Sequence, residues 1–203
     1  MTAIFAGKSN PPDQELVRQA LSGSLAAFNA LVERYQGLVF NICYRLTANQ
    51  DLAADATQEA FLSAYRHLRQ LRDGSFRAWL ARIATNCAYD CLRAKRRRQA
   101  QSLEELVDEQ DRVPALVDDS PSPEQAALAA ELSRVVEAAI QELPYDQRAV
   151  LVLVDLNGFD YTEVATALQI SLGTVKSRLS RARAKLRDKL MADRELLPPG
   201  LRL

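Results

Sequence analysis

The sequence predicts an all-α protein of two helical domains, and three observations support this fold class. Apolar residues recur at helical spacing along almost the whole chain, and no stretch alternates in the manner of a β-strand. Residues 99–124 interrupt this periodicity with an acidic, proline-containing segment that is typical of a flexible linker. Glycine, proline and small polar residues occur where helices should begin or end. We therefore predict domains at 24–98 and 125–190, an N-terminal segment with a short helix at 1–23 and a C-terminal tail at 191–203.

Within the first domain, breaker residues divide the apolar periodicity into separate segments. The short helix of 1–23 precedes this domain, and the apolar segments 28–35 and 38–46 are expected to form two further helices. Another helix should begin near residue 49 and run to about 71, where the sequence RDGS (72–75) breaks it. Ser75 then stands at the N-cap of a long helix that ends in a basic block.

The second domain has clear start signals for its helices. The sequence SPEQ (122–125) has the pattern of a capping box with proline at the first helical position. Pro144 should separate the first helix from another over about 145–156. Asp160, with Glu163 three residues later, predicts the cap of a further helix.

The charges of the chain are segregated although their total is balanced. There are 26 lysines and arginines and 26 aspartates and glutamates, so the net charge of the molecule does not indicate a polyanionic partner. Residues 93–98 and the helix after Ser171 are basic, however, whereas 99–124 is acidic. Such asymmetry is more informative about partners than the net charge.

Cysteine and histidine usage argues against several classes of site. Three cysteines, an odd number, disfavour a disulfide framework and favour a reducing compartment. We expect Cys87 and Cys91 to be small buried helix residues rather than a redox pair. One histidine and no CxxC leave a zinc site without ligands. Without a signal pattern or an apolar run near ~20 residues, we expect a cytoplasmic protein with no metal, no cofactor and no membrane insertion.

Residues 161–190 carry the strongest functional signal and predict two helices joined by a tight turn. In the second helix, apolar residues from Val175 to Leu190 recur on one face. Hydroxyl and cationic side chains lie on the opposite face and its flanks, namely Thr174, Lys176, Ser177, Arg178, Ser180, Arg181 and Lys185. A helix held by one face, with such groups on the other, suits the major groove of DNA.

A helix-turn-helix shape alone does not establish DNA binding, because many such helices are purely structural. The charge pattern favours DNA here. A solvated helix would interleave acids with its cations, whereas the seven cations of this helix are opposed along the sequence only by Asp188. We expect Ser177 and Arg181 to reach base edges and Lys176 and Arg178 to contact phosphates.

These residues and those before them resemble a known family. The C-terminal half closely resembles region four of bacterial RNA polymerase sigma factors in LPYDQRAVLVLVDLNGFDYTEVATAL and LGTVKSRLSRARAKL, and GTVKSRLSRAR looks like the extracytoplasmic-function group. The N-terminal half is similar to region two of that group in FNALVERYQGLVFNICYRLT, DATQEAFLSAYRHL and FRAWLARIATNCAYDCLRAKRRR. The resemblance spans about residues 25–190 in the family's order. It implies a non-catalytic subunit that directs promoter-specific initiation, with region four on the −35 element.

The resemblance also implies a site that opens the −10 promoter element. In the family, a loop and the helix after it hold a flipped base by stacking and hydrogen bonding. The corresponding residues are Leu71, Arg72, Asp73, Gly74, Ser75, Phe76, Asn86, Arg93, Arg96 and Arg97. Asn86 matches the family's pocket asparagine, and this loop is about one residue shorter than in some relatives. We assign Trp79, on the same helix, to core packing.

Polymerase contacts are a further implication. Asp55, Gln58 and Glu59 form an acidic ridge that on its residues alone is best explained as a solvated helix face. The resemblance makes it the contact for the clamp coiled coil of the polymerase's largest subunit. It also implies contact with the flap of the second largest subunit and control by an anti-sigma factor. The acidic linker is either a solvated tether or a segment that follows the polymerase cleft.

Two other classes of function compete with this interpretation. An autonomous helix-turn-helix regulator would need a dimer face to match two half-sites, and the sequence offers no heptad or spare apolar helix for one. A helical interaction protein, or a hydrolase that uses the acidic ridge, lacks any gathered catalytic constellation. Addition of the protein to core polymerase separates these hypotheses.

Overall fold

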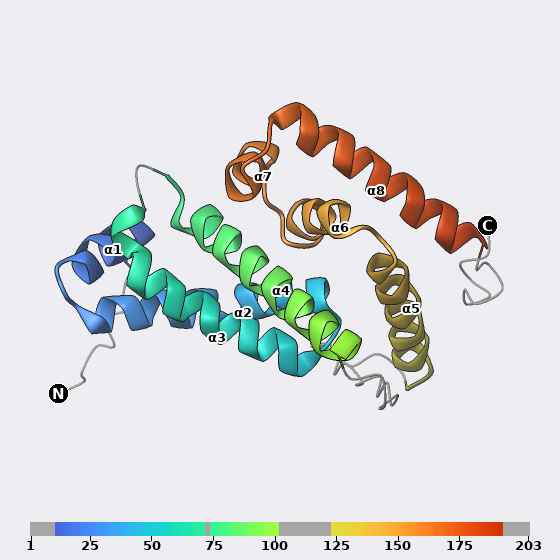
Figure 1. Ribbon diagram of the computed structural model, residues 1–203, viewed down its shortest axis with the longest axis horizontal. Coiled ribbons are helices and arrows are strands. Elements are labelled where there is room, and N and C mark those ends of the chain that lie inside the picture. The colour runs from blue at the N-terminus through green and yellow to red at the C-terminus, as the bar shows by residue number, and fades with distance from the viewer. Residues whose placement is uncertain (1–10, 72–73, 102–122, 193–203) are drawn as a thin grey trace, which may run out of the picture.

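The structure is a computed structural model that describes residues 11–71, 74–101 and 123–192, and all regular structure in these residues is helical (Figure 1). The all-α fold class is thereby confirmed. The elements are α1 (Asp13–Leu21), α2 (Leu25–Thr47), α3 (Gln50–His67), η1 (Leu68–Gln70), α4 (Phe76–Gln101), α5 (Pro123–Gln141), α6 (Tyr145–Leu151), η2 (Val152–Leu156), α7 (Tyr161–Leu168) and α8 (Leu172–Ala192). Of the short elements, η1 is a 3₁₀ turn and η2 is π-helical. We call α1–α4 the N-terminal unit and α5–α8 the C-terminal unit.

Helix α2 differs from its predicted bounds. The segments 28–35 and 38–46, expected to be separate helices, are continuous in α2. Leu31 before Gly37 and Val39 after it are both fully buried in the same core. Glycine in a helix interior costs only about 1 kcal/mol relative to alanine, so burial on both sides carries the helix through Gly37.

Capping side chains set where the helices of the N-terminal unit begin. The Ser24 hydroxyl accepts the backbone N–H of Ala27 at the start of α2. Ala48 ends that helix in the left-handed region at φ 52°, and Asn49 caps α3 over a distance of 2.8 Å. The Ser75 hydroxyl accepts a backbone N–H in the first turn of α4, at 3.3 Å, as the sequence predicts.

In the C-terminal unit, the helix predicted over 145–156 changes its winding part of the way along. It begins as α6 and continues as the π-helical η2. The Asn157 amide donates to the carbonyl of Val152 at 2.7 Å, and Gly158 turns the chain at φ 64°. The wider turn fixes the direction in which the chain enters α7.

The predicted capping signal at the start of α7 is confirmed. The Asp160 carboxylate accepts the backbone N–H groups of Thr162 and Glu163 at 2.7 and 2.8 Å. The Glu163 carboxylate in return accepts the Asp160 N–H at 3.0 Å. Gln169, in the left-handed region at φ 54°, ends α7, and a short turn leads into α8. Helices α7 and α8 therefore form the predicted helix-turn-helix.

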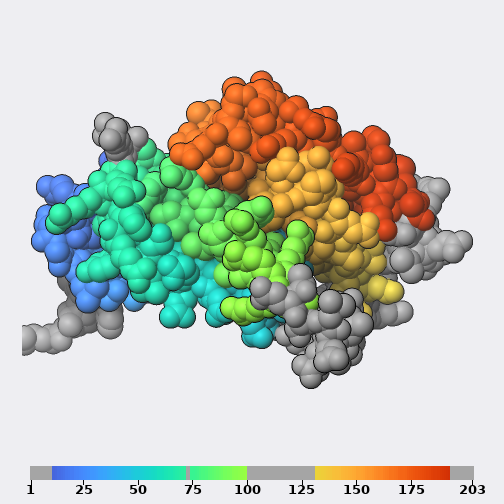
Figure 2. Space-filling view, in the orientation of Figure 1, coloured from blue at the N-terminus to red at the C-terminus, as the bar shows by residue number. Residues whose placement is uncertain are grey.

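The two units pack against each other (Figures 1 and 2). Their buried residues form one continuous core, which includes Ile42 and Leu46 of α2 together with Ile140, Val150 and Leu153 of the C-terminal unit. Two domains are predicted from the sequence, but their packing against each other is not. Residues 102–122, in the predicted linker, lie outside the described residues.

A buried arginine joins the units at the end of α2. Arg148 of α6 is only 7% exposed, and its guanidinium donates to the carbonyl of Leu46 at 2.8 Å. It also donates to the carbonyls of Gln141 and Leu143 at 2.6 and 3.1 Å. Burial lowers the pKa of Arg148, but a guanidinium keeps its charge in proteins. One cation therefore satisfies terminal carbonyls of α2, of α5 and of the chain that follows α5.

The middle of α4 provides a second junction. The Tyr145 hydroxyl of α6 donates to the carbonyl of Thr85 at 2.6 Å, and the Tyr145 and Tyr89 rings lie 5.0 Å apart. Burial raises the pKa of Tyr145, so the phenol remains a hydrogen-bond donor.

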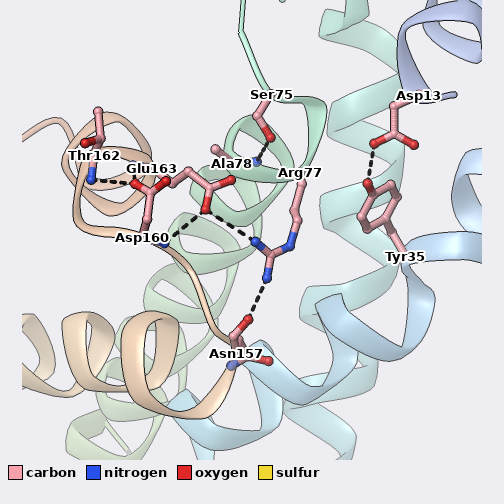
Figure 3. Close-up of polar contacts among 9 residues, drawn as sticks. All are labelled: Asp13, Tyr35, Ser75, Arg77, Ala78, Asn157, Asp160, Thr162 and Glu163. Atoms are coloured by element: carbon pink, nitrogen blue, oxygen red, sulfur yellow. Dashed lines mark hydrogen bonds and ion pairs between the residues drawn. The ribbon is translucent and has the colours of Figure 1, made fainter.

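Arg77 forms the third junction, at the start of α4 (Figure 3). Its guanidinium donates to the carbonyl of Asn157 at 2.5 Å and lies 3.4 Å from the Glu163 carboxylate. It also lies 3.7 Å from the centre of the buried Phe159 ring. Figure 3 shows Glu163 between its two partners, the Asp160 N–H and Arg77. The start of α4 is thus tied directly to the start of the helix-turn-helix.

We predict that Arg77→Ala loosens the packing of the two units without unfolding either. The change removes hydrogen bonds from a charged group and a cation–π contact, which together stabilise the packing by about 2 kcal/mol. Hydrogen exchange of the 157–163 backbone should accelerate by about thirtyfold. Arg66→Ala, an equal loss of charge at an exposed position of α3, is the matched control. Equal exchange in both variants would contradict a role for Arg77 in the packing.

Candidate nucleic-acid interface

Helix α8 is anchored by the predicted apolar stripe. Val175, Leu179 and Ala182 are all buried against the rest of the C-terminal unit. Ser177 and Arg181 are exposed and, at 100° per residue, lie on the opposite side of the helix. The packing therefore presents these two side chains outward.

The side chains of this outward face hold one another in position. The Ser177 hydroxyl donates to the carbonyl of Thr174 at 3.1 Å. The Arg181 guanidinium lies along the helix and donates to the Ser177 hydroxyl and carbonyl, each at 3.2 Å. Thr174 is half-buried, and its hydroxyl lies 2.8 Å from that of Ser171, which caps α8 through the Thr174 N–H. Ser177 and Arg181 therefore form one unit on this face.

Other elements neutralise part of the basic character that the sequence indicated. Arg178 pairs with Asp146 at 3.1 Å, so this predicted phosphate contact is half-buried against α6. Arg183 makes a bidentate pair with Asp155, with distances of 2.6 and 2.9 Å. A further pair joins Lys189 to Glu142 at 2.9 Å. Asp188 is thus the only acid that opposes the cations along the helix itself, but in the fold three more acids oppose them: Asp146 of α6, Asp155 of η2 and Glu142, which follows α5.

Lys176 and Lys185 are exposed and have no acidic partner among the described residues. Lys176 lines a groove of about 670 Å³ between the start of α7 and the side of α8. The other lining residues are Tyr161, Leu179, Ser180, Arg183, Ala184 and Arg187. Three cations and the exposed Ser180 hydroxyl thus border a groove beside the outward face.

The predicted −10 loop is partly anchored in the core. Gly74 and Ser75 are exposed and Leu71 is half-buried, whereas residues 72–73 lie outside the described part of the chain. Phe76 is only 3% exposed and packs against other aromatic rings. Its side chain fixes the end of the loop and is not offered to a ligand, in contrast to the expected contact.

The remaining predicted −10 residues lie along α4. Asn86, Arg93, Arg96 and Arg97 are all exposed. Asn86, Arg93 and Arg97 are spaced seven and four residues apart, which places them on one face of the helix. Trp79 is half-buried and its ring lies 5.9 Å from that of Phe76, which confirms its assignment to core packing.

The acidic ridge is on the surface of α3. Asp55, Gln58 and Glu59 are exposed and share one helix face. Asp55 also borders a small groove between α3 and the end of α4, which Lys95 and Arg98 line from the other side. The Glu59 carboxylate lies 3.5 Å from Arg66, at a distance where an exposed pair contributes little to stability.

Cysteines and acidic groups form no site in the part of the chain that the structure describes. All three cysteines are free, and no three His, Cys, Asp or Glu side chains of residues 11–71, 74–101 and 123–192 gather as metal ligands do. Burial raises the pKa of Cys43 to about 12 and that of Cys87 to about 11. No helix among the described residues combines the length and the apolar character needed to cross a membrane.

Sequence reasoning did not find the residues that bring the units together. Arg77, Tyr145 and Arg148 were not singled out, since their partners lie 60 to 102 residues away along the chain. Only Glu163 had a local signal, as the second half of the capping box.

Comparisons with known proteins match both units, in the same order. The family models described as "Sigma-70 region 2" and "Sigma-70, region 4" match residues 31–98 and 133–186. The chain is 37% identical over 180 residues to the ECF RNA polymerase sigma-E factor of Escherichia coli, covering 88% of this chain and 94% of that protein. It is 38% identical over 167 residues to the ECF RNA polymerase sigma factor SigE of Mycolicibacterium smegmatis, covering 82% of this chain but 63% of that longer protein.

A solved structure has the same fold. It is the sigma factor RpoE in complex with the anti-sigma factor NepR, from Bartonella quintana. The TM-score is 0.65 and the sequence identity 25%, over 82% of this chain and 98% of that one. The similarity extends over both units.

We predict that Cys43 and Cys87 react slowly with a thiol reagent in the folded protein. At pH 8 a pKa near 11 leaves about a hundredfold less thiolate than the ordinary value of 9.0, and the thiolate is the reactive form. Reaction rates per cysteine, measured by mass spectrometry with and without denaturant, test this. Labelling of Cys87 at the denatured rate would show that burial does not protect it.

Proposed function

The chain belongs to the extracytoplasmic-function group of sigma-70 RNA polymerase sigma factors, and we propose that its two units read the two halves of a promoter. The C-terminal unit would bind duplex −35 DNA through α8. The N-terminal unit would capture the opened −10 strand with the loop 71–76 and α4. The protein would perform no covalent chemistry and would act by directing core polymerase.

The observation that carries this proposal is the composition of the exposed side of α8. Acids from other elements neutralise Arg178, Arg183 and Lys189, and the outward face keeps the mutually oriented pair of Ser177 and Arg181. A face that is pre-organised in this way suits readout of bases in the major groove. A structural surface helix has no need of such a pair.

The two sides of α8 support different roles in binding. Arg181 lies at the centre of the outward face, where a guanidinium reaches acceptor atoms on guanine. Lys176 borders the groove beside the outward face and has no acidic partner among the described residues, which suits a contact with the phosphate backbone; Arg183 and Arg187 line the same groove but are paired with Asp155 and Asp188. Arg178 is less available for phosphate than its sequence position suggests, because Asp146 holds it.

The −10 half of the proposal rests on α4 and the loop before it. The exposed face with Asn86, Arg93 and Arg97 offers hydrogen bonds and positive charge along the helix. Single-stranded DNA is held by such a combination of backbone neutralisation and contacts to unstacked bases. Phe76 would contribute by anchoring the loop rather than by touching a base.

The packed units must separate for both promoter elements to be read at once. The −35 and −10 elements are centred about 25 base pairs apart, or about 85 Å at 3.4 Å per base pair. A compact chain of 203 residues has a radius of gyration of only about 17 Å. A chain of the length of residues 102–122 spans at most about 70 Å, which permits wide separation of the units. Opening of the contacts at Arg77, Tyr145 and Arg148 is therefore part of the proposed function.

Core polymerase is the proposed agent of this separation. The exposed ridge at Asp55, Gln58 and Glu59 would bind the clamp coiled coil of the largest subunit, and the C-terminal unit would bind the flap of the second largest. A cytoplasmic anti-sigma partner is also proposed, since the structural relative from Bartonella quintana is in complex with one.

Transcription with purified components tests the whole proposal. The protein is added to core polymerase with a library of promoter fragments, and we expect transcripts that depend on both the protein and an intact −35 and −10 sequence. DNA binding by the protein alone, with no engagement of core polymerase, would refute the proposal and favour an autonomous regulator.

We predict that Arg181→Ala and Lys176→Ala weaken −35 binding in different ways. Loss of a bidentate base contact costs about 1–3 kcal/mol on the matched sequence and little on a scrambled one. Loss of a phosphate contact weakens both and reduces the slope of log affinity against log salt by about 0.9. Holoenzyme binding to matched and scrambled −35 duplexes, over a series of salt concentrations, measures both effects. Equal losses for the two variants on the two duplexes would contradict the assigned roles.

A further inference from the structure

Helix α1 contacts the region around the predicted −10 loop, although no residue of α1 was assigned a role. It precedes the matched region 31–98. Leu16 is only 3% exposed and joins the main core, with Val17 and Ala20 packed against it. Helix α1 lies against α2 and also contacts η1 and α4, the elements on either side of the loop.

Asp13, the first residue of α1, joins this helix to α2 (Figure 3). One carboxylate oxygen accepts the Tyr35 hydroxyl proton, and the other pairs with the Arg34 guanidinium. Arg34 also donates to the carbonyl of Pro11 at 2.7 Å. Burial, together with the hydrogen bond to Asp13, raises the pKa of Tyr35, so this phenol stays protonated and remains a donor.

Tyr35 carries this contact to the end of the loop. Its ring lies 5.5 Å from that of Phe76, at an angle of 54° between the ring planes. Phe76 is buried, is the first residue of α4 and is followed one turn later by Trp79, at 5.9 Å between ring centres. The end of the loop is therefore fixed by an aromatic cluster whose outer member, Tyr35, is held by Asp13.

The start of the loop lies on the same support. η1 leads directly into Leu71, which packs against the core, and η1 is in contact with α1. Both ends of the loop are thus held by elements that α1 touches. Ser75 adds only a local cap to α4, so at this end of α4 the aromatic cluster and α1 add to the direct packing of α4 on α2 and α3.

We propose that Asp13 is a positioning residue for recognition of the −10 element, acting through Tyr35 and Phe76. This inference rests on the proposed function of the loop. Asp13 touches no DNA. It holds the Tyr35 ring that packs on Phe76, and so positions Phe76 and the start of α4, which carries the other proposed −10 contacts.

The experiment measures discrimination at the −10 element with holoenzyme reconstituted from the full chain. The variants are Asp13→Ala, Tyr35→Phe and the double variant, with Glu15→Ala as the matched control. Glu15 is also an acid of α1, but its bonds to Arg18 and Gln19 stay within that helix. The readout is the rate of open-complex formation on the matched promoter divided by that on promoters with single −10 substitutions.

We expect Asp13→Ala and Tyr35→Phe each to lower this ratio by about fivefold, as loss of one charge-assisted hydrogen bond would. The double variant should lose no more than Asp13→Ala, because both changes remove the same contact. Asp13→Glu, which keeps a carboxylate, should restore most of the ratio. Affinity for core polymerase and dependence on the −35 sequence should stay within twofold of wild type.

Three results would overturn the inference. The first is a ratio for Asp13→Ala that equals that of Glu15→Ala. The second is a loss that falls equally on core affinity, −35 dependence and the −10 ratio, since that pattern reflects general unfolding. The third is additive losses in the double variant. A wild-type protein that does not discriminate −10 sequences would instead refute the proposed function itself, and the two failures are therefore distinguishable.

Discussion

The arrangement of this protein depends on how the terminal carbonyl groups of two helices are satisfied. The C-terminal end of α2 and the chain after α5 meet where water is excluded, and their carbonyls need donors. Arg148 provides them with a single guanidinium and places a positive charge at the negative end of the α2 dipole. Among the described residues no carboxylate is hydrogen-bonded to it, and its acceptors are backbone carbonyls and the side-chain amide oxygen of Gln141. Such hydrogen bonds are strong where water is excluded, and water molecules can take their place on the guanidinium if the two units separate.

The contacts between the packed units are therefore mostly ones that water can replace if the units separate. Arg77, Tyr145 and Arg148 each donate to one backbone carbonyl of the opposite unit, and Arg77 also bonds the Glu163 carboxylate. Each of these groups can be hydrated after separation, and the helix-turn-helix keeps its own capping box and apolar anchor. The proposed reading of the −35 element would need only this capping box and this anchor. The proposed separation, in which each unit leaves the other to bind polymerase and DNA, would therefore require no refolding.

The sequence predicted what is decided locally. The caps at Ser75 and Asp160, the two units and the outward face of α8 all follow from residues a few positions apart. The features that could not be predicted depend on residues that are distant in the sequence but adjacent in the fold. Continuity of α2 through Gly37 depends on the core that both halves share, and the neutralisation of Arg183 depends on an acid 28 residues earlier. Phe76 was placed among the DNA contacts by its position in the loop, although only the folded aromatic cluster reveals that it is an anchor.

The π-helical segment η2 has a consequence for how such proteins diverge. A π turn accommodates one residue more than an α turn within the same helix. Loss of one residue from 152–156 would restore ordinary α-helical winding, and all that follows would rotate by about 100° about the helix axis. The amino-acid sequence of α8 would be unchanged, but its outward side chains would point in another direction. This short segment thus sets the direction in which the outward face of α8 points, independently of the residues on that face.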